Sequence, residues 1–150
     1  MKKLFLFFAV AFMFRAAAQD KPGYDSVLAK KLGADEYGMK HYVMAFLKPG
    51  TAKIDSAQRS VLMAGHLKNI GRLAREGKLL LAGPFLDRGP FSGIFIFDVT
   101  TVDEAKALVS TDPAVQAGMF TMELHPWYGS AALMQVVPQH ARLQKTSLTD

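Results

Sequence analysis

The chain of 150 residues contains no cysteine, and this absence excludes several classes of protein. Disulfide frameworks, thiol nucleophiles and thiolate metal sites all require cysteine. The sequence also lacks an apolar run of the roughly 20 residues that a membrane-spanning helix needs. It has no glycine-rich phosphate-binding motif, no HExxH zinc motif and no GxSxG nucleophile motif. The common nucleotide-binding, zinc-protease and serine-hydrolase signatures are therefore missing.

A strong excess of one charge is also missing once the N-terminus is set aside. Removing Lys2, Lys3 and Arg15 from the 18 basic residues leaves 15 basic against 13 acidic residues, a net charge of about +2. A surface that follows a nucleic-acid backbone needs more basic residues, gathered on one face. We therefore expect no nucleic-acid partner.

Residues 1–18 have the three parts of a secretory signal peptide. Two lysines precede an apolar run over residues 4–14, and three alanines follow at positions 16–18. A run of this length is too short to span a membrane. We expect cleavage between Ala18 and Gln19, and so export to the periplasm or the medium without a remaining membrane span. Retention as an N-terminal anchor is the alternative, and Arg15 interrupts the region before the cleavage site.

The rest of the chain has the composition of one globular domain, with 50% hydrophobic and 21% charged residues overall. Residues 19–37 are polar and contain Pro22, Gly23 and Gly33, which predicts a linker with one or two helical turns over residues 26–32. We expect the domain to occupy residues 38–129 and a C-terminal tail to occupy residues 130–150.

Hydrophobic periodicity predicts an α+β fold with the element order β-α-β-β-α-β. Strands are expected over residues 40–47, 78–85, 91–99 and 119–127, the last ended by Pro126. A long helix is expected over residues 56–76. A second helix should start at a capping box formed by Thr101 and Glu104 and run to about Val109. This order predicts the ferredoxin-like fold, with a four-stranded antiparallel sheet.

Both faces of the predicted sheet are apolar. In the first strand, Val43 and Ala45 alternate with Tyr42, Met44 and Phe46. Two helices cover only one face of such a sheet, so a second copy of the chain is the simplest cover for the other. We therefore expect a homodimer packed sheet to sheet, with ALMQVV at residues 132–137 of the tail as the alternative cover.

One histidine interrupts the apolar face of the long predicted helix. His66 follows Leu62 by four residues and precedes Ile70 by four, so it shares their face or its margin. Burial of an imidazole costs free energy unless a partner satisfies its nitrogens. A carboxylate partner would make the ring a usable general base, whereas a backbone carbonyl would make it a structural core residue. Spacing leaves both interpretations open.

Asp112 is the second residue that the pattern singles out. It directly precedes Pro113, which favours a helix cap as its role. The four histidines show no metal-ligand spacing, although His41 and His125 fall on strands expected to be neighbours. We expect neither a metal nor a cofactor.

Three segments together resemble the YCII-related family, also called YciI-like. They are HLKNIGRLAREGKLLLAGPF at residues 66–85, TDPAVQAG at residues 111–118 and ELHPW at residues 123–127. The resemblance covers about residues 40–128. It implies a ferredoxin-like α+β barrel made by two chains packed sheet to sheet.

The resemblance also implies a His–Asp dyad in a pocket, which here would be His66 and Asp112. The family's glycine after the first helix and its GP(F/L) element match Gly77 and residues 83–85. We assign five residues to substrate binding, with Ser92 and Trp127 added as pocket candidates: Gly83, Pro84, Phe85, Ser92 and Trp127. Large aromatic residues at strand ends also suit a core or a dimer interface.

Two functions remain open from the sequence. In the first, the protein is a cofactor-free enzyme of the isomerase or lyase type, and His66 moves a proton on a small organic acid while Asp112 orients the ring. In the second, the protein is a non-catalytic ligand-binding or dimeric interaction domain, in which the same pair only satisfies a buried histidine. Whether the chain is an enzyme at all is not decided by these residues.

Overall fold

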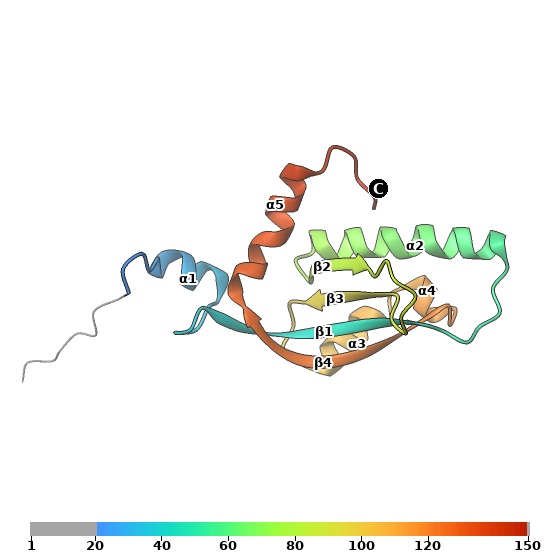
Figure 1. Cartoon of the computed structure of the whole chain (residues 1–150), viewed down its shortest axis with the longest axis horizontal. Helices are drawn as coiled ribbons and strands as arrows, with labels where there is room; N and C mark the ends of the chain where they lie inside the picture. The colour runs from blue at the N-terminus through green and yellow to red at the C-terminus, as the bar shows by residue number, and fades with distance from the viewer. Residues whose placement is uncertain (1–20, 150) are drawn as a thin grey trace, which may run out of the picture.

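The computed structural model describes residues 21–149, so the expected signal segment and its cleavage site lie outside the described residues. Four strands form one sheet: β1 (Met39–Pro49), β2 (Leu79–Pro84), β3 (Gly93–Phe97) and β4 (Phe120–Ser130). Their order is β2-β3-β1-β4, and every neighbouring pair is antiparallel (Figure 1). This topology confirms the predicted ferredoxin-like α+β fold.

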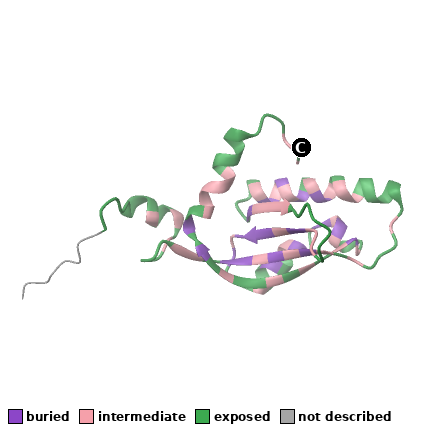
Figure 2. Ribbon diagram, in the orientation of Figure 1, coloured by how far each residue is buried: buried purple, intermediate pink, exposed green. Residues whose placement is uncertain are grey.

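Three helices cover one face of the sheet: α2 (Ser56–Arg75), α3 (Val102–Val109) and α4 (Pro113–Gln116). Asp55 caps the start of α2 by accepting a hydrogen bond from the Gln58 N–H. The predicted capping box of Thr101 and Glu104 forms at the start of α3. The first core lies between these helices and the sheet, where the buried strand centres lie (Figure 2). Its buried residues are Val43, Ala45, Leu73, Leu79, Phe95, Phe97, Val99, Ala105 and Val109.

The second face of the sheet is partly covered by the chain's own tail. After β4, the tail forms η1 (Ala131–Gln135) and α5 (Val136–Leu143). Leu133 and Met134 pack against a buried cluster of Tyr42, Leu80 and Ile96. The alternative cover expected from the sequence is therefore present over one end of this face. The other end, which includes Phe46 and Ile94, is only half-buried.

The predicted end of the last strand is wrong. The strand continues through Pro126, which lies opposite Val43, and ends at Ser130. Within residues 21–149, β4 has a neighbouring strand on one side only. A proline without an N–H is tolerated in such an edge strand, because its missing donor need not pair with a neighbour.

The predicted helical turns before the domain are present as α1 (Ser26–Leu32), which is capped by Asp25. A hydrogen bond from the Tyr128 hydroxyl to Asp35 joins the segment after α1 to β4. This bond raises the pKa of Tyr128 to about 12 and, as the largest of several causes, holds the pKa of Asp35 below its ordinary value. Asp35 therefore joins the segment after α1 to the sheet, because it accepts hydrogen bonds from Tyr128 of β4 and from the Met39 N–H at the start of β1.

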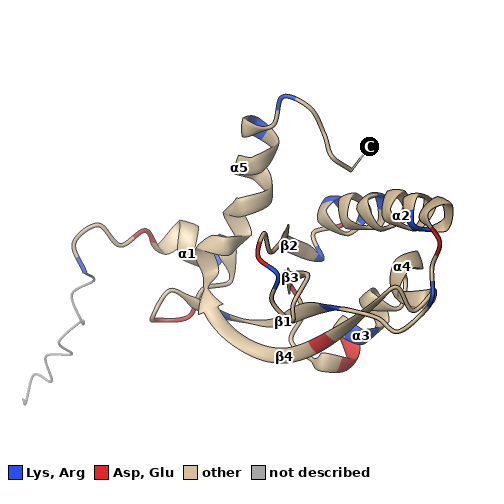
Figure 3. Ribbon diagram, turned by 45° about the vertical axis from the view of Figure 1, so that its right-hand side comes forward, with Lys and Arg blue, Asp and Glu red and all other residues tan. Residues whose placement is uncertain are grey.

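Basic and acidic side chains are dispersed over the helices, strands and loops of the described part of the chain (Figure 3). No helix within residues 21–149 is long and apolar enough to cross a membrane.

Candidate functional site

The site is built around a buried pair, His66 of α2 and Asp112 of the turn before α4. The imidazole Nδ1 lies 2.6 Å from Asp112 Oδ2, a hydrogen bond between residues 46 positions apart. The His66 side chain is 6% exposed and the Asp112 side chain 1%. In this geometry Nδ1–H donates to the carboxylate, which places the free lone pair of a neutral ring on Nε2.

Asp112 uses its other oxygen for the helix cap that the sequence predicts. Oδ1 accepts a hydrogen bond of 2.9 Å from the Ala114 N–H at the start of α4. The carboxylate therefore makes both contacts, one with each oxygen: Oδ1 caps α4 and Oδ2 pairs with His66. The cap holds the carboxylate in the orientation that directs Oδ2 at the imidazole.

Close packing of α2 against α4 brings the pair together. Gly65 directly precedes His66, and a Cβ at this position would lie 2.7 Å from Pro113 Cγ. The absence of a side chain at Gly65 therefore lets the first turn of α4 approach α2. A larger residue would push Asp112 away from the histidine.

Two phenylalanines enclose the imidazole from the sheet side. The His66 ring stacks on Phe95 of β3 at 5.8 Å between centroids and meets Phe120, at the start of β4, at 5.3 Å. These rings exclude water from much of the histidine and hold its orientation. Sequence reasoning did not connect either of them with His66, because both lie far from it along the chain.

A second polar link between α2 and the same turn was also missed from the sequence. Asn69 is buried, and its Oδ1 accepts a hydrogen bond of 2.8 Å from Arg72 Nη2. Arg72 Nη2 also donates to Thr111 Oγ1 at 2.8 Å, one residue before Asp112. The position of Asn69, three residues after His66 on α2, was the available signal.

The second ring nitrogen of His66 has no hydrogen-bond partner within residues 21–149. Every buried side-chain nitrogen or oxygen atom in residues 21–149 has a hydrogen-bond partner. Within those residues, the only hydrogen bond of this imidazole is the one at Nδ1. Nε2 is therefore not fully buried, because a fully buried Nε2 would lack a partner. It belongs to the 6% of the His66 side chain that is exposed.

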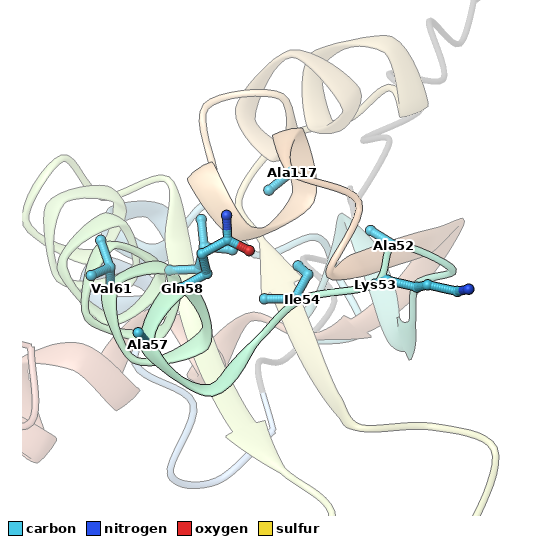
Figure 4. Close-up of a pocket in the computed structure, with 8 residues that line it drawn as sticks. Ala52, Lys53, Ile54, Ala57, Gln58, Val61 and Ala117 are labelled. Atoms are coloured by element: carbon cyan, nitrogen blue, oxygen red, sulfur yellow. The ribbon is translucent and has the colours of Figure 1, made fainter.

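An open hollow of about 590 Å³ lies at the N-terminal end of α2, next to the end of α4 (Figure 4). It is lined by residues 52–54, by Ala117, and by Ala57, Gln58, Val61 and Leu62 of α2. Lys53 is the charged residue among them. His66 does not line this hollow, but it follows Leu62 by one helical turn. The amide of Gln58 lies among the lining side chains, while Lys53 extends away from them (Figure 4).

Four of the expected substrate-binding residues lie at the β2–β3 hairpin. Gly83 pairs with Ile94, and Pro84 with Gly93. The Phe85 N–H donates to the Ser92 carbonyl at 3.0 Å, and the Ser92 N–H donates to the Leu47 carbonyl at 2.7 Å. These bonds close the hairpin and join it to β1. A role for the hairpin in substrate binding stays a prediction.

The fifth, Trp127, lies on the other face of the sheet from His66. Its ring is 5.9 Å from that of Tyr42, in the cluster that the tail covers. A single copy of the chain therefore does not bring Trp127 into one pocket with the His–Asp pair.

The remaining histidines do not assemble into a site with His66. The rings of His41 and Tyr128 are 5.1 Å apart, whereas His125 bonds to Glu123. No group of three or more potential metal-ligating side chains occurs within the described part of the chain. The approach of His41 to His125 considered from the sequence is not seen there.

Comparisons with known proteins found a matching family model and similar solved structures. A family model for the YCII-related domain matches residues 39–128, which is more than half of the chain. Among solved structures, the chain is similar to 5-chloro-2-hydroxyhydroquinone dehydrochlorinase from Burkholderia phenoliruptrix AC1100, in complex with 2,5-dihydroxybenzoquinone. That likeness has a TM-score of 0.43 and 23% identity, over 57% of this chain and 92% of that chain. No curated protein matches the chain.

Proposed function

The chain belongs to the YCII-related domain family, and we propose that it is a cofactor-free acid/base enzyme acting on a small organic acid. The observation that carries this proposal is the buried His66–Asp112 hydrogen bond of 2.6 Å beside an Nε2 that remains accessible. A carboxylate at one ring nitrogen and access at the other are what a histidine needs to act as a general base.

In the proposed reaction, Nε2 removes a proton from a carbon next to a carbonyl or carboxyl group of the substrate. Asp112 keeps Nδ1–H in place and stabilises the imidazolium that forms. Return of the proton to a different carbon gives isomerisation, and departure of a leaving group gives elimination. Phe95 and Phe120 keep the ring from turning away during both steps.

In this proposal the substrate binds in the hollow beside α2 and extends from it toward His66, one helical turn beyond Leu62. The volume of the hollow, about 590 Å³, suits a small molecule. Its lining is mostly aliphatic, and Lys53 adds a positive charge at its border that would attract a carboxylate. Replacement of Lys53 by Gln should raise KM for an acidic substrate and leave kcat nearly unchanged.

We also propose that the protein is exported and forms a homodimer. Export rests on the signal pattern of residues 1–18, and the mass of the protein purified from its host would show whether cleavage occurs before Gln19. The dimer rests on the apolar half of the second sheet face that the tail leaves half-buried. Light scattering at micromolar concentration should give twice the mass of one chain, and a monomer would contradict this.

A second candidate function is a non-catalytic binding or interaction domain. The observation that favours it is the double use of Asp112, whose second oxygen caps α4 while the first satisfies a nearly buried histidine. In that case the pair joins α2 to α4 and has no chemical role.

Replacement of His66 by Gln separates the two functions. Turnover should be measured over a panel of small unsaturated and hydroxylated acids, together with the thermal unfolding of wild type and variant. The enzyme proposal predicts turnover by the wild type and its loss in the variant, beyond any loss of folded protein. A large fall in stability with no wild-type turnover on any compound would support the binding domain instead.

A further inference from the structure

Gln58, Leu62 and His66 form one row along α2, because each follows the one before it by four residues. The first two line the hollow at the start of the helix. Burial increases along the row: Gln58 is exposed, Leu62 is half-buried and His66 is buried. The row therefore leads from the solvent toward the imidazole, and a ligand held along it has one exposed end and one buried end.

The surface of the hollow along this row is mostly aliphatic. Six of the eight lining residues have aliphatic side chains: Ala52, Ile54, Ala57, Val61, Leu62 and Ala117. None of these eight residues, all within the described part of the chain, is aromatic, so none of them offers a ring on which a planar aromatic substrate stacks. A flexible alkyl chain suits this lining, because the hydrophobic effect that favours its burial is not directional.

The exposed end of the row offers a polar group. The amide of Gln58 lies among the lining side chains (Figure 4). Within residues 21–149 this amide has no hydrogen-bond partner, and Gln58 bonds to the Asp55 side chain only through its backbone N–H. The NH₂ group of the amide can donate to a carboxylate oxygen. A substrate carboxylate belongs at this end, because burial of a second negative charge beside Asp112 would cost much more free energy.

The spacing of the row sets the length of the ligand. An α-helix rises about 1.5 Å per residue, so Leu62 and Gln58 precede His66 by about 6 Å and about 12 Å along the axis. An extended chain advances about 1.2 Å per bond, so distances of this size correspond to about five to ten bonds. A carboxylate so far from the reacting carbon does not acidify it. A separate carbonyl group must therefore lie next to that carbon.

We propose that the substrate is a chain-shaped oxo acid, with its carboxylate at Gln58 and its reacting carbon at His66, about five to ten bonds apart. This inference rests on the proposed function of His66 as a general base and specifies its substrate class. Nε2 takes a proton from the carbon next to the carbonyl group, and the electron pair of that C–H bond passes into the enolate. The imidazolium then returns a proton to the enolate. Gln58 is the residue that determines specificity for chain length.

Binding of saturated acids, which lack the second carbonyl group, tests the chain-shaped ligand without any reaction. The purified protein is titrated with pentanoate, octanoate and benzoate while NMR follows the ring signals of its four histidines. Each buried methylene contributes about fourfold in affinity, so octanoate should bind at least about tenfold more tightly than pentanoate. Octanoate should move the ring signals of His66 and leave those of His140 in place. Benzoate, with a planar ring, should bind more weakly than octanoate.

Variants assign the length preference to the hollow. Gln58→Ala should weaken octanoate binding about fivefold through the loss of one hydrogen bond. Gln139→Ala, the same change at an exposed glutamine of α5, should leave binding unchanged. Ala57→Leu fills part of the hollow and should bring the affinity for octanoate close to that for pentanoate. All three positions are exposed, so unfolding midpoints close to wild type are expected and would show that the fold is intact.

Deuterium exchange separates the substrate class from the proposed reaction. The terminal methyl group is seven bonds from the carboxyl carbon in 7-oxooctanoate and four bonds away in 4-oxopentanoate. In D₂O, the wild type should exchange the methyl hydrogens of 7-oxooctanoate at least about tenfold faster than those of 4-oxopentanoate, because three more methylenes are buried. His66→Gln should lose this exchange.

Three results would overturn the chain-shaped substrate. The first is pentanoate binding as tight as octanoate binding. The second is octanoate binding that leaves the His66 signals in place. The third is exchange as fast with 4-oxopentanoate as with 7-oxooctanoate, which would refute the substrate class and leave proton transfer at His66 intact. Tight octanoate binding at His66 without exchange of either oxo acid would overturn the proposed reaction, and with it the role of the chain-shaped acid as a substrate.

Discussion

Replacement of Asp112 by Asn is the most informative perturbation of the buried pair. Asp112 Oδ1 accepts from the Ala114 N–H at 2.9 Å, and Oδ2 accepts from the His66 ring at 2.6 Å. An asparagine has one oxygen and one NH₂ group in the same space, so it cannot accept at both positions. If the oxygen keeps the cap, the NH₂ group faces Nδ1, which must then accept a hydrogen bond instead of donating one. The ring proton moves to Nε2, and the base disappears without a large change of shape.

The expected cost in stability is modest and follows from the same two contacts. The cap survives, because Asn is as good as Asp at this position. A hydrogen bond to a charged group, about 1.5–3 kcal/mol, is exchanged for a neutral one of about 0.5–1.5 kcal/mol. Asp112→Asn should therefore lower the free energy of unfolding by about 1 kcal/mol. Asp112→Ala should cost about 2–4 kcal/mol, because it removes the cap and leaves Nδ1 without its acceptor.

Long-range proton–nitrogen NMR of the His66 ring identifies the protonated nitrogen, and urea unfolding measures stability. The wild type should carry its proton on Nδ1 when neutral, and Asp112→Asn should carry it on Nε2. Asp112→Ala is the matched variant, in which the larger loss of stability is expected. A proton that stays on Nδ1 in Asp112→Asn, together with a stability loss as large as in Asp112→Ala, would refute the reasoning.

Three further predictions concern packing, pH and the tail. Gly65→Ala should lower the free energy of unfolding by about 1–3 kcal/mol in urea, because its Cβ would lie 2.7 Å from Pro113 Cγ. Gly83→Ala is the control: its Cβ meets no atom within 4 Å, so its stability should stay within about 0.5 kcal/mol of wild type. Asp35→Asn should bring the pKa of Tyr128 down from about 12 toward 10 in an ultraviolet titration. The pKa of Asp35 is lowered and that of Tyr128 is raised in the folded state, so their bond should stabilise the wild type between about pH 4 and pH 10. Outside this window the stabilisation should disappear progressively. The same dependence of stability on pH in Asp35→Asn as in wild type would contradict this. A chain that ends at Ser130 should bind more of a fluorescent hydrophobic dye and unfold at lower urea, since Leu133 and Met134 no longer cover Tyr42 and Ile96; unchanged dye binding would show that the tail is not a cover.

The fold was predictable because its signals are local or strictly periodic. Alternation in the first strand separated Val43 from Tyr42, and the structure places them in the two cores on opposite faces of the sheet. The capping box of Thr101 and Glu104 set the start of α3. Pro126 misled the prediction, because a proline usually ends a strand and is tolerated here only since β4 is an edge strand.

The site was predictable only where a resemblance joined distant residues. His66 and Asp112 are 46 positions apart. The local pattern favoured a helix cap for Asp112 and left His66 open between a structural residue and a general base. The surroundings of the imidazole depend on packing between α2, β3 and β4, so Phe95 and Phe120 carried no signal of their contact. The separation of Trp127 from His66 likewise follows from the side of the sheet that each faces, which requires the helices to be placed first.

Proton transfer at His66 is the central claim, and hydrogen–deuterium exchange tests it most directly. Small carbon acids, incubated with the protein in D₂O and followed by proton NMR, would reveal removal of a C–H proton even where no net reaction follows. The account predicts exchange with the wild type, its loss in His66→Gln and Asp112→Asn, and its retention in the His140→Gln control. Exchange that is equally fast in wild type and His66→Gln would contradict the account.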